Sequence, residues 1–401
     1  PYTGSLKKAE ELQLLDEHSN VLLTVPYTGE APWPVATDET GHSLILSNPS
    51  YGEGDPRAWD NSTFAGGSPG TADVYPVSQY GNVVINEFLP HSENPSVPQF
   101  IELYNHGADS NDISGCVLTD DPTTNKFVIP PETVIGPDGF VTFTQSQFGF
   151  TLNGAGETLY LISADGSRIL DAVQFAAQAD GVSYGRSPDG ADDFYAFTAR
   201  TPGTNNSAIL IGNIVINELM FDPISKDDND QYIELYNQGA SATDLSGWQL
   251  TGGVSYSLPP GTTLAAGGYL VVARNAAQLI SHYPNLNAAN CLGNFSGKLS
   301  HNGELVMLSR PETIYTNTPI MVAEDQVTYG AGGRWGQWAD GGGSSLELKN
   351  PRANHRLAAN WKDSDETRKS AWTNIEFTGT LDNGFNFDPT IDYAQIGILD
   401  T

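Results

Sequence analysis

The sequence predicts an all-β protein made of tandem β-sandwiches, and three observations support this fold class. Short segments such as residues 100–105 and 139–143 alternate side chains with a period of two, as half-buried strands do. Turn sequences such as Pro188-Asp189-Gly190 separate these segments at the spacing of a sandwich. One block of strand motifs also occurs twice, which indicates a duplicated unit.

The duplicated block joins three motifs, namely Val-Val-Ile-Asn-Glu-Phe at 83–88, Phe-Ile-Glu-Leu-Tyr-Asn at 100–105 and Asp-Ile-Ser-Gly at 112–115. It returns at residues 214–219, 232–237 and 244–247. Subtracting Ile101 from Ile233, and Asp112 from Asp244, gives 132 in both cases. Because the motifs moved together, they belong to one repeated unit rather than to a chance match.

Residues 1–75 match the C-terminal half of the same unit, so we predict that they form that half. Trp33 and Trp59 stand opposite Trp335 and Trp361 at a constant offset of 302, so we interpret all four as core residues. Residues 2–6 and 11–12 match 295–299 and 304–305 at an offset of 293. Half a β-unit leaves an open sheet edge and an uncovered apolar face. Three sources of cover remain open, namely a longer polypeptide, a neighbouring subunit or the second repeat.

The repeats and their connectors set the expected domain boundaries. We predict a C-terminal half-sandwich at 1–75, complete sandwiches at 83–203 and 214–370, and a β-rich tail at 371–401 that begins a further jelly-roll-like domain. The connectors are too short to act as flexible spacers, so we expect the units to sit end to end. The one convincing helix lies near 276–283 and is stopped by Pro284.

Composition limits the classes of partner. The 401 residues carry a formal net charge of -30, which argues against nucleic acid and against anionic membrane surfaces. No apolar run is long enough to span a membrane, so we expect no membrane insertion. The two cysteines, Cys116 and Cys291, fall at different places in their repeats and cannot form a disulfide framework. Cys116 takes the place of Trp248 and is expected to be a buried, inert thiol.

The motif set resembles the lamin tail domain in its bacterial, secreted form. The resemblance rests on Ile-Val-Ile-Asn-Glu at 214–218, Tyr-Ile-Glu-Leu-Tyr-Asn at 232–237, Asp-Leu-Ser-Gly-Trp-Gln-Leu at 244–250, Gly-Tyr-Leu-Val-Val at 268–272 and the closing Trp-Ala-Asp-Gly-Gly-Gly-Ser-Ser-Leu-Glu-Leu at 338–348. It implies immunoglobulin-like sandwiches, the first one truncated to its C-terminal half. It implies no catalytic residues, because such domains serve as non-enzymatic modules of secreted or cell-surface proteins.

Two glutamate pairs and one serine are the candidates for catalysis. Glu87 with Glu102, and Glu218 with Glu234, are expected on neighbouring strands, where a carboxylate pair can do acid–base work, hold a metal or fix the strand register. Their repetition in both units favours the structural role. Ser183 lies in a Gly-x-Ser-x-Gly sequence, but a turn rather than a helix follows it. We therefore expect no enzyme.

Two ligand sites are predicted. Asp222, Asp227, Asp228 and Asp230 lie between two strands and offer enough oxygens for Ca²⁺, although without the spacing of an EF-hand loop. Calcium is the single cofactor that the sequence indicates. Trp338 and Trp372 do not recur in the other repeats, which leaves them available as stacking platforms for a glycan.

These observations predict a non-enzymatic structural or adhesive protein, extracellular or on the cell surface and of bacterial type. Its partners are expected to be other proteins, through self-association or through further domains of a parent chain. The alternative is a carbohydrate-binding or calcium-dependent binding module of a larger secreted enzyme.

Overall fold

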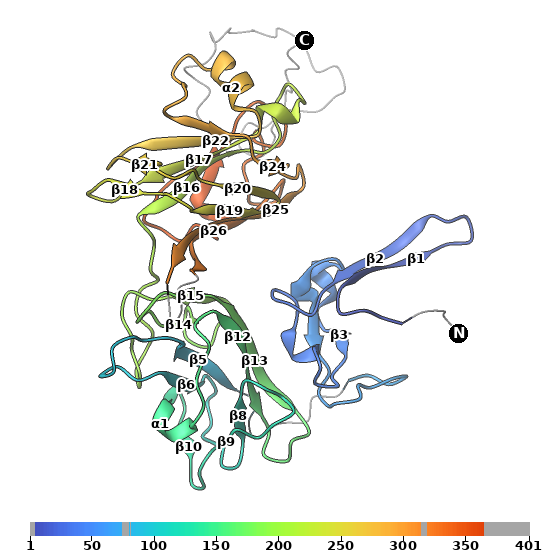
Figure 1. Ribbon diagram of the computed structural model, residues 1–401. Coiled ribbons are helices and arrows are strands. Elements are labelled where there is room, and N and C mark those ends of the chain that lie inside the picture. The colour runs from blue at the N-terminus through green and yellow to red at the C-terminus, as the bar shows by residue number, and fades with distance from the viewer. Residues whose placement is uncertain (1–4, 74–79, 81, 314–318, 365–401) are drawn as a thin grey trace, which may run out of the picture. The chain divides into compact units, whose positions relative to one another are not determined.

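The computed structural model describes residues 5–73, 80, 82–313 and 319–364. The described chain is mostly β-strand with short helical segments, as the sequence predicts (Figure 1). The helical segments are α1 (Gln145–Phe148), α2 (Ala276–His282), η1 (Val35–Thr37), η2 (Pro49–Tyr51), η3 (Pro56–Ala58), η4 (Asp228–Asp230) and η5 (Ala358–Asn360). Helix α2 confirms the predicted helix, and Asn275 begins it by accepting the Gln278 N–H. The predicted tail at 371–401 lies outside the described residues.

The second sandwich consists of two main antiparallel sheets and a short pair. One sheet has the order β11 (Gly139–Thr144), β6 (Phe100–Asn105), β5 (Val83–Leu89), β14 (Tyr184–Arg186), β15 (Phe194–Ala196). The other has the order β13 (Ile169–Ala176), β12 (Gly156–Ile162), β8 (Val117–Thr119), β9 (Phe127–Val128). The pair is β7 (Asn111–Asp112) with β10 (Val134–Ile135).

The third sandwich repeats this plan with one more strand in each main sheet, and the added strand β23 (Cys291–Gly293) runs parallel to its neighbour. Its first sheet has the order β23 (Cys291–Gly293), β22 (Tyr269–Ala273), β17 (Tyr232–Asn237), β16 (Ile214–Met220), β27 (Leu346–Leu348), β28 (Trp361–Asp363). Its second sheet has the order β24 (Ser296–Gly297), β20 (Val254–Ser257), β19 (Gln249–Gly252), β25 (Gly303–Glu312), β26 (Ile320–Gly330). The short pair is β18 (Thr243–Asp244) with β21 (Thr263–Leu264).

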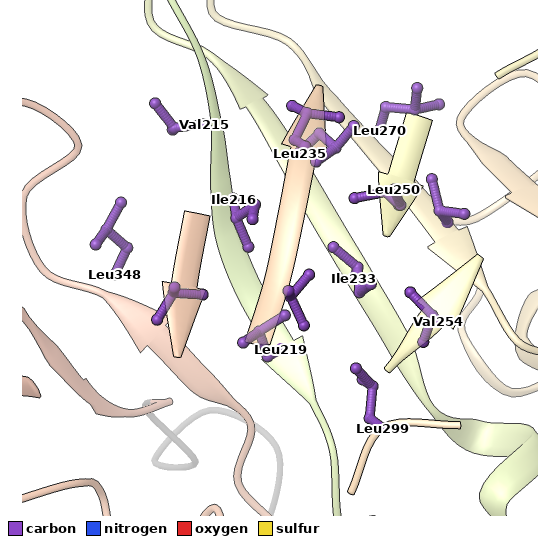
Figure 2. Packing of buried hydrophobic residues seen from close by; sticks show 14 of the residues in the cluster. Val215, Ile216, Leu219, Ile233, Leu235, Leu250, Val254, Leu270, Leu299 and Leu348 are labelled. Atoms are coloured by element: carbon purple, nitrogen blue, oxygen red, sulfur yellow. The ribbon is translucent and has the colours of Figure 1, made fainter. Parts of the chain in front are cut away.

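The core of the third sandwich lies between its two sheets. Ile216, Leu219 and Ile233 of the first sheet join Leu250 and Val254 of the second in one buried cluster, part of which Figure 2 shows. The second sandwich has a corresponding core, in which Cys116 stands where the third has Trp248. Both side chains are buried, so the replacement changes the local packing and leaves the fold intact.

A β-bulge at the Asn-Glu motif determines which of its side chains point into the core. On β16, Ile216 pairs with Leu235 and Glu218 with Glu234, so Asn217 is the extra residue of its strand. The strand β5 shows the same shift between Ile85 and Glu87. The extra residue turns Asn217 and Glu218 away from the core while Ile216 and Leu219 remain inside it.

Residues 5–73 repeat the back half of the third sandwich in two short sheets. The pairs are β1 (Glu10–Leu15) with β2 (Val21–Tyr27), and β3 (Leu44–Leu46) with β4 (Trp59–Asn61). Trp59 donates to the Glu53 carbonyl at 3.0 Å, as Trp361 donates to that of His355 at 2.8 Å. The predicted correspondence of Trp59 and Trp361 is therefore confirmed.

The first strand corresponds at a register one residue from the predicted one. Glu10 pairs with Tyr27 as Glu304 pairs with Tyr329, so Glu10 rather than Glu11 matches Glu304. Both matched tyrosines also donate their hydroxyl to the matched glutamate, at 3.0 Å in the half-unit and 3.3 Å in the third sandwich. Adjacent glutamates at 10 and 11 made the sequence alignment ambiguous.

Candidate functional site

The duplicated motifs place two glutamates opposite each other on neighbouring strands of each complete sandwich. Glu87 pairs with Glu102 across β5 and β6, and Glu218 pairs with Glu234 across β16 and β17. The predicted pairing is confirmed. Because their neighbours Ile101 and Ile233 point into the cores, the glutamates lie on the outer face of the sheet.

In the second sandwich a single segment, residues 197–206, covers the glutamate pair, and we call it the cover segment. The backbone N–H and the hydroxyl of Thr201 donate to Glu87 at 3.1 and 3.0 Å. The backbone N–H of Gly203 donates to Glu102, which also accepts the hydroxyl of Thr142 at 3.0 Å. Both carboxylates are fully buried. The pair thus anchors a peptide segment to the outer face of the sheet.

In the third sandwich the corresponding pair is partly exposed and a third carboxylate joins it. Glu347 on β27 pairs with Glu218, at the place where Gly185 pairs with Glu87 in the second sandwich. Glu218 accepts the hydroxyl of Tyr232 at 2.6 Å and that of Ser345. The strands β17, β16 and β27 therefore carry three neighbouring carboxylates across one face.

Burial governs the protonation of these carboxyl groups. It raises the pKa of Glu102 to about 7 against the hydrogen bonds from Gly203 and Thr142, and it raises the pKa of Glu87 as well. Burial also raises the pKa of Glu234 to about 7, with the charge of Glu218 adding to the effect. Near neutral pH, Glu102 and Glu234 are therefore each present partly as the neutral acid and partly as the carboxylate.

The sequence of the chain matches a known family over two regions. The family model described as Lamin Tail Domain matches residues 76–177 and 208–367, which together make up more than half of the chain. The chain belongs to the lamin tail domain family. Its lamin tail sandwiches are immunoglobulin-like and occur in tandem, as the sequence predicts.

Similarity to solved structures is weak. Among solved structures the chain is similar to a DUF4876 family protein from Bacteroides thetaiotaomicron, at 10% identity and a TM-score of 0.23. That match covers 56% of this chain and 76% of the other. No curated protein matches the chain.

The four aspartates predicted to bind calcium lie in the β16–β17 loop of the third lamin tail sandwich, where protein side chains contact each of them. Asp222 pairs with Lys226 at 3.0 Å, and Asp228 pairs with Arg274 and Lys298 at 3.4 Å each. Asp227 and Asp230 accept hydrogen bonds from the Gln278 amide at 2.8 and 2.9 Å. The surrounding basic side chains thus supply positive charge to the loop.

This arrangement leaves calcium binding as a prediction. Over the residues that the structure describes, no group of three or more His, Cys, Asp or Glu side chains is arranged to hold a metal ion. His301 also lies 3.1 Å from Asp228, so it is a further side-chain partner of the loop.

The two predicted stacking platforms have different outcomes. Trp338 is 58% exposed and lies on a loop whose Asp340 forms an isolated β-bridge with Asp222. Trp372 lies outside the described residues. Ile224, also exposed, belongs to the facing loop, because a Cβ on Gly343 would lie 3.4 Å from its Cδ1. Trp338 and Ile224 are thus two exposed apolar side chains on neighbouring loops.

The candidate nucleophiles are buried. Ser183 is buried next to β14, so a strand follows it rather than the helix that a nucleophile elbow requires. Burial raises the pKa of Cys116 to about 11, which keeps its thiol protonated at neutral pH. Among the described helices, none combines the length and the apolar character needed to cross a membrane.

Sequence reasoning missed one buried residue that the repeat shares. Gln231 donates to the carbonyls of Phe221 and Leu299 and accepts the Leu299 N–H, and Gln99 makes the same three contacts in the second sandwich. The signal was a glutamine directly before each six-residue strand motif, Phe-Ile-Glu-Leu-Tyr-Asn after position 99 and Tyr-Ile-Glu-Leu-Tyr-Asn after position 231. This glutamine joins the loop before its own strand to a loop that leads into the opposite sheet, before β12 in the second sandwich and before β25 in the third.

Proposed function

We propose that the chain is a non-enzymatic structural protein, extracellular or on the cell surface, whose lamin tail sandwiches make protein–protein contacts that include self-association. The observation that carries the proposal is the apolar face of the half-unit. Leu12 and Leu14 on β1 are 41% and 56% exposed. Their counterparts on β25, Val306 and Leu308, are fully buried.

The open edge of β1 supports the same proposal. In the third sandwich β25 lies between β19 and β26, whereas within the described residues β1 pairs with β2 alone. An exposed strand edge beside exposed leucines is the usual site for addition of a strand from another chain. A neighbouring polypeptide that packs on β1 therefore satisfies both the hydrogen bonds and the apolar face.

The chemistry of the candidate residues supports a non-enzymatic role. The Glu87–Glu102 pair is occupied by the cover segment, Ser183 is buried beside a strand, and the Cys116 thiol is held protonated. The net charge of -30 favours a well-solvated surface, as on a secreted protein. Detection of the protein at the cell surface by antibody on intact cells tests the location.

Light scattering during size exclusion tests self-association of the full chain. We expect a mass above that of one chain that rises with protein concentration. Replacing both Leu12 and Leu14 by Lys is expected to give a monomer, because charge on this face prevents apolar packing. Leu357→Lys changes a comparably exposed leucine of the third sandwich and is expected to leave the mass unchanged. A well-folded wild-type chain that stays monomeric at every concentration overturns the proposal.

Exposed Trp338 favours a second candidate, a glycan-binding module. A large indole on an exposed loop offers the flat face on which sugar rings stack. A glycan array probed with the wild-type chain and with Trp338→Ala, each with and without Ca²⁺, tests this candidate. Loss of a glycan signal in the variant supports it, and silence of the wild-type chain on every glycan contradicts it.

A further inference from the structure

A lysine and an aspartate contact each other across the β8–β9 hairpin of the second sandwich. Asp120 directly follows β8, and Lys126 directly precedes β9. Nζ of Lys126 forms an ion pair with Oδ1 of Asp120, and this oxygen atom is buried. The Asp120 side chain is 13% exposed and that of Lys126 is 34% exposed. An amine and a carboxyl carbon are therefore neighbours at a place where the carboxyl group has little contact with solvent.

The loop between these two residues is held by its own hydrogen bonds. Oδ1 of Asp121 accepts the backbone N–H and the hydroxyl of Thr123, at 2.9 and 2.7 Å. The Asp121 carbonyl accepts the hydroxyl of Thr119 at 2.8 Å. The ring centroid of Phe150, which packs against the core of the second sandwich, lies 5.5 Å from Nζ of Lys126. These contacts hold the amine beside the carboxyl group, and such positioning raises the effective concentration of the two groups.

A third ionisable side chain, that of Glu157 on β12, lies near the pair. It points to the same face of the sheet as Leu159, which is part of the core. Burial raises the pKa of Glu157 to about 7 against the hydrogen bond from the Asn153 N–H, the charge of Asp120 raises it and that of Lys126 lowers it. A carboxyl group with this pKa can both accept and donate a proton at neutral pH.

The other units give the corresponding glutamate a different partner. In the third sandwich Glu304 pairs with Tyr329 and accepts its hydroxyl at 3.3 Å. The half-unit has the same hydrogen bond between a tyrosine and a glutamate. Glu157 pairs instead with Phe175, which has no hydroxyl group. The second sandwich has therefore lost the tyrosine partner of this glutamate and has placed Lys126 and Asp120 near it.

The third sandwich has neither member of the lysine–aspartate pair. Register places Gly252 at the position of Asp120 and Ser255 at the position of Lys126. There the strand β20, which corresponds to β9, is flanked by the further strand β24. Among the described residues β9 is instead the edge strand of its sheet and pairs with β8 alone (Figure 1). The pair thus occurs in the sandwich whose hairpin has no flanking strand.

We propose that Nζ of Lys126 and Cγ of Asp120 form an intramolecular amide bond that ties the edge strand β9 to β8. Nζ attacks Cγ, a C–N bond forms, and one C–O bond of the carboxyl group breaks. Two protons of the ammonium group leave with that oxygen as water, so the step needs no other reactant. Glu157 carries one of these protons, through one water molecule, from Nζ to the leaving oxygen and returns to its starting form.

The bond changes what holds the hairpin together. The strands β8 and β9 share two residue pairs, Val117 with Val128 and Leu118 with Phe127. An amide at the loop end of these pairs keeps the two strands together when their hydrogen bonds open. It also replaces two opposite charges at a partly buried place by a neutral group.

The mass of the denatured full-length chain tests whether the bond forms. We expect a mass lower by one water than the sequence requires. Formation of a succinimide at an Asp-Gly sequence, such as Asp138-Gly139, also removes one water, so peptide mapping must locate the change. Trypsin cleaves after a free lysine but not after a lysine in an amide bond. We therefore expect one tryptic peptide of residues 58–168 in place of the two peptides 58–126 and 127–168.

Three variants show whether the lost water comes from this pair. Lys126→Arg keeps the positive charge, but its guanidinium stays protonated and is not a nucleophile. Asp120→Ala removes the carboxyl carbon. Both variants are expected to have the full mass of their sequences. Lys362→Arg changes a lysine that pairs with Glu347 at 3.1 Å and is expected to retain the loss of water. Circular dichroism confirms that each variant is folded.

Glu157→Gln tests the proton transfer. Glutamine keeps an oxygen for the Asn153 N–H but cannot exchange a proton at neutral pH. The mass of chains from cell-free synthesis, followed over time at a series of pH values, gives the rate of water loss. We expect the wild-type rate to vary with pH near neutrality, and the rate in Glu157→Gln to be at least about tenfold lower and to lose that variation. Glu304→Gln changes the matching glutamate of the third sandwich and is expected to leave the rate unchanged.

Three results overturn the proposal. They are a wild-type chain with the full mass of its sequence, complete tryptic cleavage after Lys126, and a loss of water that persists in Lys126→Arg. Equal rates and pH profiles in Glu157→Gln and wild type overturn the role assigned to Glu157.

Discussion

Nδ1 of His355 lies 2.8 Å from Oδ1 of Asp325, and this pair takes the place of an Arg–Asp pair in the second sandwich. There Arg186 contacts Asp171 at 2.9 Å. Asp171 and Asp325 correspond, because each also accepts the backbone N–H of a matching strand residue, Ile85 or Ile216, at 2.7 Å. One buried ion pair of the repeat is thus permanent and the other is titratable.

The pairing makes the stability of the third sandwich depend on pH. Burial lowers the pKa of His355, but the hydrogen bond and the charge of Asp325 and the carbonyl of Pro351 outweigh it, so the pKa is raised above 6.5. The contribution of His355 is therefore complete below pH 6.5 and is lost as pH rises through the folded-state value. We expect the free energy of unfolding, measured by denaturant titration, to fall over that interval.

Replacement of the histidine tests this explanation. His355→Phe leaves Asp325 buried without its cation, and we expect a loss of about 3–5 kcal/mol at pH 6 together with a flatter pH profile. His18→Phe changes an exposed histidine and should leave the profile as it is. An unchanged slope in His355→Phe would show that other groups cause the pH dependence.

Matched leucines in the half-unit and the third sandwich differ in burial, and replacing each of them measures what that burial contributes. Leu308→Ala creates a cavity in a closed core and is expected to lower the free energy of unfolding by about 2–5 kcal/mol. At concentrations where the chain is monomeric, Leu14→Ala should change it by less than about 0.5 kcal/mol, because Leu14 is exposed. Hydrogen exchange in β2 and β26 assigns each loss to its unit. Equal losses in the monomer would contradict the exposure of Leu14.

The buried glutamine before β17 is expected to be a stability determinant. Gln231→Leu leaves the Phe221 carbonyl and both backbone groups of Leu299 without a partner, at a cost of about 2–4 kcal/mol. Calorimetric unfolding measures this loss. Gln13→Leu on the exposed strand β1 serves as the control, and a similar loss there would mean that side-chain volume rather than hydrogen bonding decides the result.

Calcium has a direct test at the β16–β17 loop. We expect the midpoint of thermal unfolding to be the same with Ca²⁺ and with a chelator, because Lys226, Arg274 and Lys298 already provide the loop aspartates with cationic partners. A Ca²⁺-dependent rise in the midpoint that disappears in Asp228→Asn would instead establish the calcium site predicted from the sequence.

Local sequence patterns predicted the strands, whereas the segments that cover the strands come from distant parts of the sequence. The alternation at 100–105 predicted that Ile101 and Leu103 point into the core, because the period of a strand is a local property. It gave no information on whether Glu102 is covered. That depends on Gly203, which lies 101 residues further along the chain.

The same limit applies to the ion pairs and the loops. Asp171 and Asp325 occupy matching places, yet their partners Arg186 and His355 come from different points of the closing segment. The aspartates of the β16–β17 loop were recognisable from the sequence, but Arg274 and Lys298 reach them from other parts of the fold. A charge cluster in the sequence therefore could not show how its charge is balanced.

Because of the bulge at Asn86 and Asn217, substitutions on the outer face of the sheet are independent of substitutions in the core. Since the extra residue fixes which side chains enter the core, the outer face can change without disturbing the inner one, as the exchange of Gly185 for Glu347 shows. A duplicated module of this kind can acquire a new partner through a few substitutions on one face of its sheet. The two copies in this chain thus carry different residues at the same place of one scaffold, Gly185 in the second sandwich and Glu347 in the third.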